Sequence, residues 1–279
     1  MDAKMQKSIQ KFATQIRIGT VEAIKSRGFG HIGGALSICD ALAVLYGSQM
    51  RVDPKNPKMP DRDKLVCSKG HAGPSIYATL ALKGFYPYEE IKTLNQPGTK
   101  FPSHCDWKKT PGVDITTGSL GQGTSLAVGI ALADKLKKRD CRTFLIVGDG
   151  ESNEGQCWEA FMFAAAKNLS NLVVLIDWNK KQLDGYTKNV LRNEDLDGKM
   201  AAFGFETAKV SGNNIEALYE ALERTRKGGD KPYAIVLDTT KGSGVREIEE
   251  TMNNHSMAVD ESKFDEWIGG LKDALAAME

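Results

Sequence analysis

Two polar side chains follow two apolar runs in the middle of the chain, at a spacing that suits metal chemistry. Asp149 stands in Gly148-Asp149-Gly150 directly after the apolar run 143–147, and Asn179 ends the run 172–179. The residues between them predict a helix over about 154–168, which would connect the two runs as parallel strands. Because ligands of open α/β sheets collect at the carboxyl ends of the strands, we expect Asp149 and Asn179 at one edge of a sheet.

The chemistry of this pair is that of a divalent cation beside a diphosphate. Asp149 offers a hard anionic oxygen and Asn179 a neutral carbonyl oxygen, which suit Mg²⁺, with Ca²⁺ or Mn²⁺ as alternatives. Gly148 and Gly150 let the backbone approach a phosphate closely, and the helix that follows would present free N–H groups to an anion. A lone Gly-Asp-Gly is more often an ordinary turn, so the prediction depends on Asn179 at the next strand end.

The histidines of the chain form a second candidate set. There are four of them, and each falls in an expected loop: His31, His71, His104 and His255. A single histidine is more often an ordinary surface or core residue than part of a site. Four in loops near strand ends instead favour a shared role in proton transfer or in pairing with phosphate oxygens.

The elements that must position these residues alternate between strands and helices. Besides the two runs above, strands are expected at 64–68, 206–210 and 233–237. Helices are expected over 3–27, over 35–46 with Ser37 as a cap, from Pro74 onward, and over 87–94, 118–138, 194–203, 215–227 and 261–277. We expect irregular structure at 96–117, a glycine-rich turn at 241–245 and an exposed turn at 246–250. This pattern predicts an α/β fold: a doubly wound, mostly parallel sheet with helices on both faces, in one domain spanning 1–279.

The composition excludes several classes of protein. The 279 residues are 41% hydrophobic and 26% charged with a net charge of +1, which is ordinary for a globular domain and gives no support for a nucleic-acid surface. No apolar run is long enough for a membrane span, and the N-terminus lacks the apolar segment of a signal peptide. The five cysteines are scattered without a CxxC pair, so we expect idle thiols in a cytoplasmic protein.

The spacing of these motifs resembles that of thiamine-diphosphate enzymes. Gly-Asp-Gly followed about 30 residues later by Asn179 resembles the binding motif of that cofactor. The four histidines are similar in context to those of the N-terminal part of transketolase. Their contexts are Gly30-His31-Ile32-Gly33, Ser68-Lys69-Gly70-His71, His104 ahead of Thr117-Gly118-Ser119-Leu120-Gly121-Gln122-Gly123, and His255 after the glycine-rich turn. The third context departs from the family, which has Gly-His-Pro where this chain has Ser103-His104-Cys105-Asp106.

The resemblance implies the diphosphate-binding domain of the family and a role for each matching residue. The divalent metal, Mg²⁺ in the first instance, would be bound by Asp149, Asn179 and the backbone carbonyl of Lys181. Further contacts to thiamine diphosphate would come from His71, Gly150, Gly118, Leu120 and Leu183. Sugar hydroxyls and protons would be handled by His31, His104 and His255, and Glu154 would join a carboxylate network at an interface between subunits.

The resemblance also implies a partner. A full transketolase chain is more than twice this length, and no second α/β domain is evident here. We therefore expect a split enzyme, in which a separate C-terminal subunit supplies the pyrimidine-binding and C-terminal domains. Such an enzyme would form a heterotetramer of two plus two chains, inactive without the partner. It would transfer a two-carbon ketol unit, glycolaldehyde, from a ketose phosphate to an aldose phosphate.

Three other interpretations stay open at this point. The chain could be half of another thiamine-diphosphate enzyme, such as a relative of deoxyxylulose-phosphate synthase or the α subunit of a 2-oxo acid dehydrogenase. It could be a non-catalytic structural subunit that keeps the fold, although the intact site motifs argue against this. A metal-dependent phosphotransferase built on Gly-Asp-Gly is disfavoured because the chain has no GxxxxGK[ST] loop.

Overall fold

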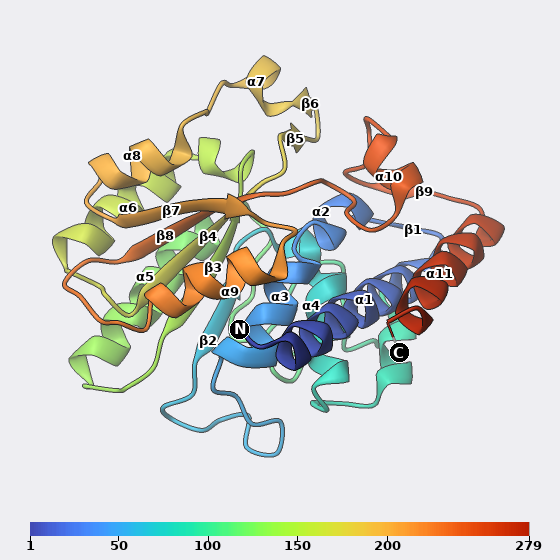
Figure 1. The fold of residues 1–279 in the computed structure, drawn as a ribbon, viewed down its shortest axis with the longest axis horizontal. Helices are drawn as coiled ribbons and strands as arrows, with labels where there is room; N and C mark the ends of the chain where they lie inside the picture. The colour runs from blue at the N-terminus through green and yellow to red at the C-terminus, as the bar shows by residue number, and fades with distance from the viewer. Residues whose placement is uncertain (279) are drawn as a thin grey trace.

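A five-stranded parallel sheet forms the centre of this computed structural model, which describes residues 1–278 (Figure 1). Across the sheet the strands are β2 (Lys64–Cys67), β3 (Thr143–Gly148), β4 (Leu172–Trp178), β8 (Tyr233–Asp238) and β7 (Glu206–Ser211). All four neighbouring pairs are parallel, and Gly148 of β3 lies opposite Asp177 of β4. The predicted α/β class, with a parallel sheet between helices, is confirmed.

Helices cover both faces because side chains alternate along each strand. Phe144 and Ile146 point into one hydrophobic cluster, while Leu145 and Val147 point into the other. The first cluster includes residues of α1 (Ala3–Lys25), α3 (Cys39–Val44), α4 (Gly73–Leu82), α9 (Ile215–Arg224) and α11 (Glu261–Ala276). The second includes residues of α5 (Gln122–Leu136), α6 (Gly155–Ala166) and α8 (Leu196–Ala202). The two groups lie on opposite sides of the sheet in Figure 1, where α1 and α11 run alongside each other.

Several of the short elements lie where the strands of the main sheet end. Two antiparallel pairs are β1 (Phe29–Gly30) with β9 (Met257–Ala258), and β5 (Lys181–Gln182) with β6 (Gly185–Tyr186). The short helices are α2 (Ile32–Leu36), η2 (Gly70–Ala72), η3 (Tyr88–Thr93), η4 (Glu151–Asn153), α7 (Thr187–Val190) and α10 (Arg246–Glu250). Figure 1 shows α2, α10 and the β5–β6 pair on the side toward which the strands point. Residues 96–117 have no helix or strand, as expected.

The structure corrects three expectations about helices. The helix expected over 35–46 is divided into α2, α3 and a π-helical turn, η1 (Leu45–Gln49), and Ser37 lies at the division instead of capping it. Ser37 donates from Oγ to the Gly34 carbonyl and to Asp177, so its side chain competes with a continuous helix. The helix expected from 118 begins only at Gln122, because Gly121 has a left-handed φ of +82°. The turn expected at 246–250 is the short helix α10.

Two expectations drawn from composition can be compared with the structure. Within residues 1–278, no helix is both long and apolar enough to cross a membrane. All five cysteines are buried free thiols, as their scattered positions predicted.

Candidate active site

Asp149 and Asn179 lie at the same edge of the sheet, as their positions after two strands predicted. Asp149 directly follows β3 and Asn179 directly follows the neighbouring parallel strand β4. Both residues are buried. The Asp149 carboxylate accepts the backbone N–H of Gly150 at 2.8 Å and that of Lys180 at 2.6 Å. Backbone donors from both strand ends therefore fix this carboxylate in place.

The surroundings of Asp149 suit a divalent cation shared with a phosphate ligand. Burial, followed by the nearby charge of Asp177, raises the pKa of Asp149 to about 7, so a cation would stabilise its ionised form. Within residues 1–278, no cluster of three or more His, Cys, Asp or Glu side chains could hold a metal by itself. Mg²⁺ is commonly bound by one or two protein oxygens together with ligand phosphates and water. The donor set of Asp149, Asn179 and a backbone carbonyl fits that mode of binding.

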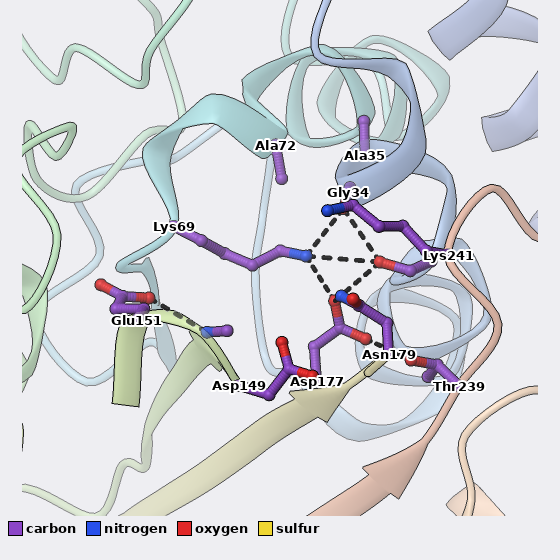
Figure 2. A network of polar contacts seen from close by, with 12 residues as sticks. Gly34, Ala35, Lys69, Ala72, Asp149, Glu151, Asp177, Asn179, Thr239 and Lys241 are labelled. Atoms are coloured by element: carbon purple, nitrogen blue, oxygen red, sulfur yellow. Dashed lines mark hydrogen bonds and ion pairs between the residues drawn. The ribbon is translucent and has the colours of Figure 1, made fainter. Parts of the chain in front are cut away.

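A buried charge network adjoins this pair (Figure 2). Asp177 is fully buried, and the Nζ of the equally buried Lys69 lies 2.5 Å from its Oδ2. The carboxylate also accepts hydrogen bonds from Ser37 Oγ at 2.7 Å, Asn179 Nδ2 at 2.8 Å and the Thr239 hydroxyl. Because Asp177 takes the amide nitrogen of Asn179, it fixes which way the amide oxygen points.

The charges of this network support one another. Burial alone would raise the pKa of Asp177, but the Lys69 ammonium and the hydrogen-bond donors hold it below its ordinary value. Sequence reasoning missed both residues as parts of the site. Their signal was present: Asp177 is the one charged residue in the apolar strand β4, and a buried charge requires a partner. Lys69 directly follows the strand expected at 64–68 and supplies that partner.

Glu151 is a second buried carboxylate that the sequence did not single out. Its Oε1 accepts the Ser68 hydroxyl at 2.5 Å and the Gly121 N–H at 2.9 Å. Its Oε2 accepts the Gly148 N–H at 3.0 Å. One side chain thus connects the end of β2, the turn before α5 and the end of β3, and it holds these three segments of the site together.

The four histidines converge although they come from distant parts of the sequence. The His31 ring centroid lies 5.5, 5.4 and 5.4 Å from those of His71, His104 and His255, and the last lies 4.8 Å from that of His71. Three of them lie outside helices and strands, but His71 lies in the single turn η2 and not in a loop.

Burial lowers the pKa of all four rings, to about 3 for His255. Near neutral pH each imidazole is therefore uncharged, with one nitrogen that donates and one that accepts a hydrogen bond. The cluster can bind hydroxyl groups and exchange protons with them.

Lys241 connects the histidines to the proposed metal ligands. Its buried Nζ donates to the Lys181 carbonyl at 2.9 Å and lies 3.2 Å from His255 Nδ1. Burial, followed by the charge of Lys69, lowers the pKa of Lys241 to about 8. The sequence predicted only a glycine-rich turn here, so this cation was also missed. A cation beside Asp149 and Asn179 favours a ligand that carries negative charge.

Polar atoms without partners point to a ligand at this edge. Gln182 Oε1, Asn254 Oδ1 and Ser256 Oγ are buried without a hydrogen bond among the described residues, and the last two flank His255. A Cβ on Gly150 would lie only 2.9 Å from the Cβ of Gln182, so this position requires glycine. A bound polar molecule would supply the hydrogen bonds that these buried atoms lack.

The remaining predicted residues lie at the rim of the site. Gly118 packs beside the ring of His104, where an added Cβ would lie 3.5 Å from the Cβ of the histidine. Leu120 and Leu183 are apolar but exposed, at 39% and 65%. Glu154 is exposed at the N-terminal cap of α6, and its side chain lies next to Gly121. Exposure of these last three residues agrees with a surface that a cofactor or a partner chain would cover.

Comparison with known proteins identifies the family of the chain. Residues 8–268 match the family model of the transketolase, thiamine diphosphate binding domain. The chain is 47% identical to the 6-deoxy-6-sulfo-D-fructose transketolase subunit SqwG of Clostridium sp. (strain MSTE9), over 94% of this chain and 95% of the relative. It is 40% identical to an apulose-4-phosphate transketolase subunit of Actinobacillus succinogenes, over 79% of each chain.

A solved transketolase has the same fold over almost the whole chain. The structure of transketolase from Campylobacter jejuni superposes with a TM-score of 0.89 at 30% identity, covering 99% of this chain. The match covers 43% of the solved chain, so this chain spans less than half of that transketolase. The chain belongs to the transketolase family, whose members transfer ketol groups, and it comprises the thiamine diphosphate binding domain of that family.

Proposed function

We propose that this chain is the diphosphate-binding subunit of a two-chain transketolase. The enzyme would transfer a two-carbon ketol unit from a ketose to an aldose, and a separate C-terminal subunit would complete it. The observation that carries the proposal is the convergence of four uncharged histidines beside the buried pair Asp149 and Asn179. Relatives of similar length that are named as subunits support the division into two chains.

The substrates we propose are sugars with an anionic end group. A ketose phosphate donor and an aldose phosphate acceptor are the general case for this family. A sulfonated donor is a specific second candidate, because the relative that is 47% identical is named for 6-deoxy-6-sulfo-D-fructose. Phosphate and sulfonate are both tetrahedral oxyanions, so one kind of cationic pocket would accept either.

In this proposal the chain holds the cofactor from its diphosphate end. Thiamine diphosphate supplies the carbon nucleophile that ketol transfer requires. Asp149, Asn179 and the Lys181 carbonyl would hold Mg²⁺, with Ca²⁺ or Mn²⁺ as alternatives, and His71 and Gly150 would contact the diphosphate. The residues that would lie against the rings of the cofactor are Gly118, Leu120 and Leu183. The fixed positions of Asp149 and Asn179 mean that little reorganisation accompanies binding.

The histidines would act on the sugar. His31, His104 and His255 are uncharged near neutral pH, so each can accept a proton from one hydroxyl while donating an N–H to another. The rings of His104 and His255 each lie 5.4 Å from that of His31, close enough for one sugar to contact more than one of them. Placing donors and acceptors against several oxygens orients a polyhydroxylated substrate and excludes competing binding modes.

The exposed apolar residues support a partner chain on one side of the site. Leu126 of α5 and Met162 and Phe163 of α6 are exposed large apolar side chains on two helices that pack against each other. Leu120, in the turn before α5, adds to this surface next to the proposed cofactor site. We propose that the C-terminal subunit covers this face in a heterotetramer of two plus two chains, with Glu154 in the interface. The five free thiols agree with a cytoplasmic enzyme.

The decisive experiment is capture of the assembled enzyme. The tagged chain would be isolated from its source cells under gentle conditions with thiamine diphosphate and Mg²⁺, and native mass spectrometry would report its partners. We expect a second chain in equal amount and ketol transfer by the complex but not by the isolated chain. Comparing the rates of ketol transfer from 6-deoxy-6-sulfo-D-fructose and from fructose 6-phosphate would show whether the preferred donor carries a sulfonate or a phosphate. Ketol transfer by this chain alone would refute the two-chain proposal.

A further inference from the structure

A pocket lined by arginines lies at the opposite edge of the sheet from the histidines. It has a volume of about 490 Å³ and is lined by four arginines together with Asp63, Asp140 and polar residues: Arg51, Arg139, Arg142 and Arg226. Residues just before β2, β3 and β4 contribute to it, namely Asp63, Arg142 and Asn171. The amino ends of the strands therefore form its floor, while Asp149 and Asn179 follow the carboxyl ends.

Uncharged groups help to hold two of the arginine side chains, Arg142 and Arg226, in place. Arg142 donates to the Gln49 carbonyl at 2.6 Å and to the Thr225 hydroxyl at 3.1 Å. Arg226 donates to the carbonyls of Ser48 and Gln49 at 3.2 and 3.1 Å. These bonds fix the guanidinium planes without cancelling their charge. They also complement the negative end of the helix that finishes at Gln49.

Carboxylates near the pocket compensate this charge only in part. Four arginines and two aspartates line the pocket, which leaves a formal charge of +2. The carboxylate of Asp63 accepts hydrogen bonds from the backbone N–H groups of Arg51 and Arg142, and it lies 3.9 Å from the Arg142 guanidinium. Asp140 is fully exposed and 3.7 Å from Arg51, where water screens it.

Two partners outside the lining neutralise part of the remaining charge. Glu223 pairs with Arg226 at 3.0 Å, and Asp134 pairs with Arg139 at 3.0 Å while also contacting Lys64. Arg142 is the most buried of the four side chains, and its ion pair with Asp63 is the longest of these pairs, at 3.9 Å. Burial lowers the pKa of Arg142, while the charge of Asp63 opposes this shift and the like charge of Arg226 adds to it.

We propose that this pocket binds a small metabolite through a phosphate or sulfonate group held by Arg142, Arg226 and Arg51. Guanidinium groups bind tetrahedral oxyanions with paired, charge-assisted hydrogen bonds. The volume is within the range of small-molecule sites and exceeds the need of a single anionic group. A ligand at this edge does not compete with the substrate of the histidine site, so it would bind at the same time as that substrate.

The test uses the full chain and inorganic phosphate as the probe, titrated by calorimetry against chloride at equal ionic strength. We expect saturable binding that Arg142→Gln and Arg226→Gln each weaken about tenfold or more, because each removes a charge-assisted contact. Arg226 is half-exposed, so its substitution keeps the test informative if Arg142→Gln fails to fold. Arg246→Gln is the matched control, since it removes an exposed guanidinium that pairs with Glu250 in another region.

A further variant separates this pocket from the histidine site. His71→Ala should leave phosphate binding unchanged if the arginine pocket is the site, and should abolish it if phosphate binds among the histidines. Repeating the titration with fructose 6-phosphate shows whether a sugar phosphate binds more tightly than the free ion. Absence of saturable binding at millimolar phosphate, or equal affinities in all arginine variants and wild type, would overturn the proposal. The arginines would then serve only to stabilise the fold.

Discussion

Replacement of Asp177 by asparagine tests the role of the buried network most directly. The substitution keeps the size of the side chain but removes its charge, and it leaves the Lys69 ammonium in a fully buried position without a counterion. Removing one partner of a buried ion pair typically costs about 3–5 kcal/mol. Because domains of this kind are stable by only about 5–15 kcal/mol, this loss would be a large part of the free energy of unfolding.

The hydrogen bonds of Asp177 explain why asparagine cannot substitute for it. Lys69, Ser37 and Asn179 all donate to Oδ2, and Thr239 donates to Oδ1. An asparagine amide accepts on one side only, and its NH₂ group would face donors. At least one donor would then be buried without an acceptor, and this would lower the free energy of unfolding beyond the loss of the ion pair.

The assay is urea unfolding at pH 7, followed by circular dichroism. The double variant Lys69→Met/Asp177→Asn removes both charges and keeps an amide acceptor, so we expect it to recover part of the stability that Asp177→Asn loses. Glu250→Gln is the control, because it breaks the exposed pair with Arg246 and should leave stability unchanged. A loss below about 1 kcal/mol for Asp177→Asn would refute the reasoning, since a buried ammonium without a counterion is far more destabilising than that.

The stability difference between wild type and Asp177→Asn should also depend on pH. The pKa of Asp177 is lower in the folded chain than in the unfolded chain, where it is about 3.9. The stabilisation is therefore complete above about pH 4 and is lost as pH falls through the folded pKa. The difference in stability between wild type and Asp177→Asn should narrow below about pH 4, and a difference independent of pH would contradict the assigned charge.

Three further predictions concern the site and the proposed interface. Asp149→Ala should weaken binding of thiamine diphosphate with Mg²⁺ more than about 100-fold, measured by calorimetry on the assembled complex, whereas the exposed Asp184→Ala should not. His255 has a folded pKa of about 3 against about 6.5 unfolded, so the unfolded state takes up its proton first and stability falls as pH decreases between these values. The free energy of unfolding, measured in urea at pH 7 and pH 5, should therefore differ less between the two pH values for His255→Asn than for wild type. An equal difference in both proteins would show that folding does not lower the pKa of this ring. Met162→Glu on the exposed face of α6 should prevent capture of the partner chain without changing the unfolding midpoint, and retained capture would exclude this face as the interface.

The local order of the chain could be predicted from the sequence because short-range patterns encode it. The apolar runs before Asp149 and Asn179 predicted two parallel strands, and the strands lie there, with both residues just after their ends. The alternation of strands and helices predicted the parallel sheet between two helical layers. The division at Ser37 could not be predicted, because its cause is a hydrogen bond to Asp177, 140 positions away.

The chemical types of the site residues were determined by the sequence, whereas their arrangement was decided by tertiary structure. Glycine, aspartate and asparagine at strand ends predicted a metal and phosphate site from their types and spacing, whereas the resemblance to transketolase implied the cofactor and the roles of the histidines. Asp177 could be recognised as a charge within an apolar strand, but its partner Lys69 and the roles of Glu151 and Lys241 could not be assigned from the sequence. Their partners come from strands and loops far apart in the sequence, and only the packed sheet removes these charges from water and forces them to pair.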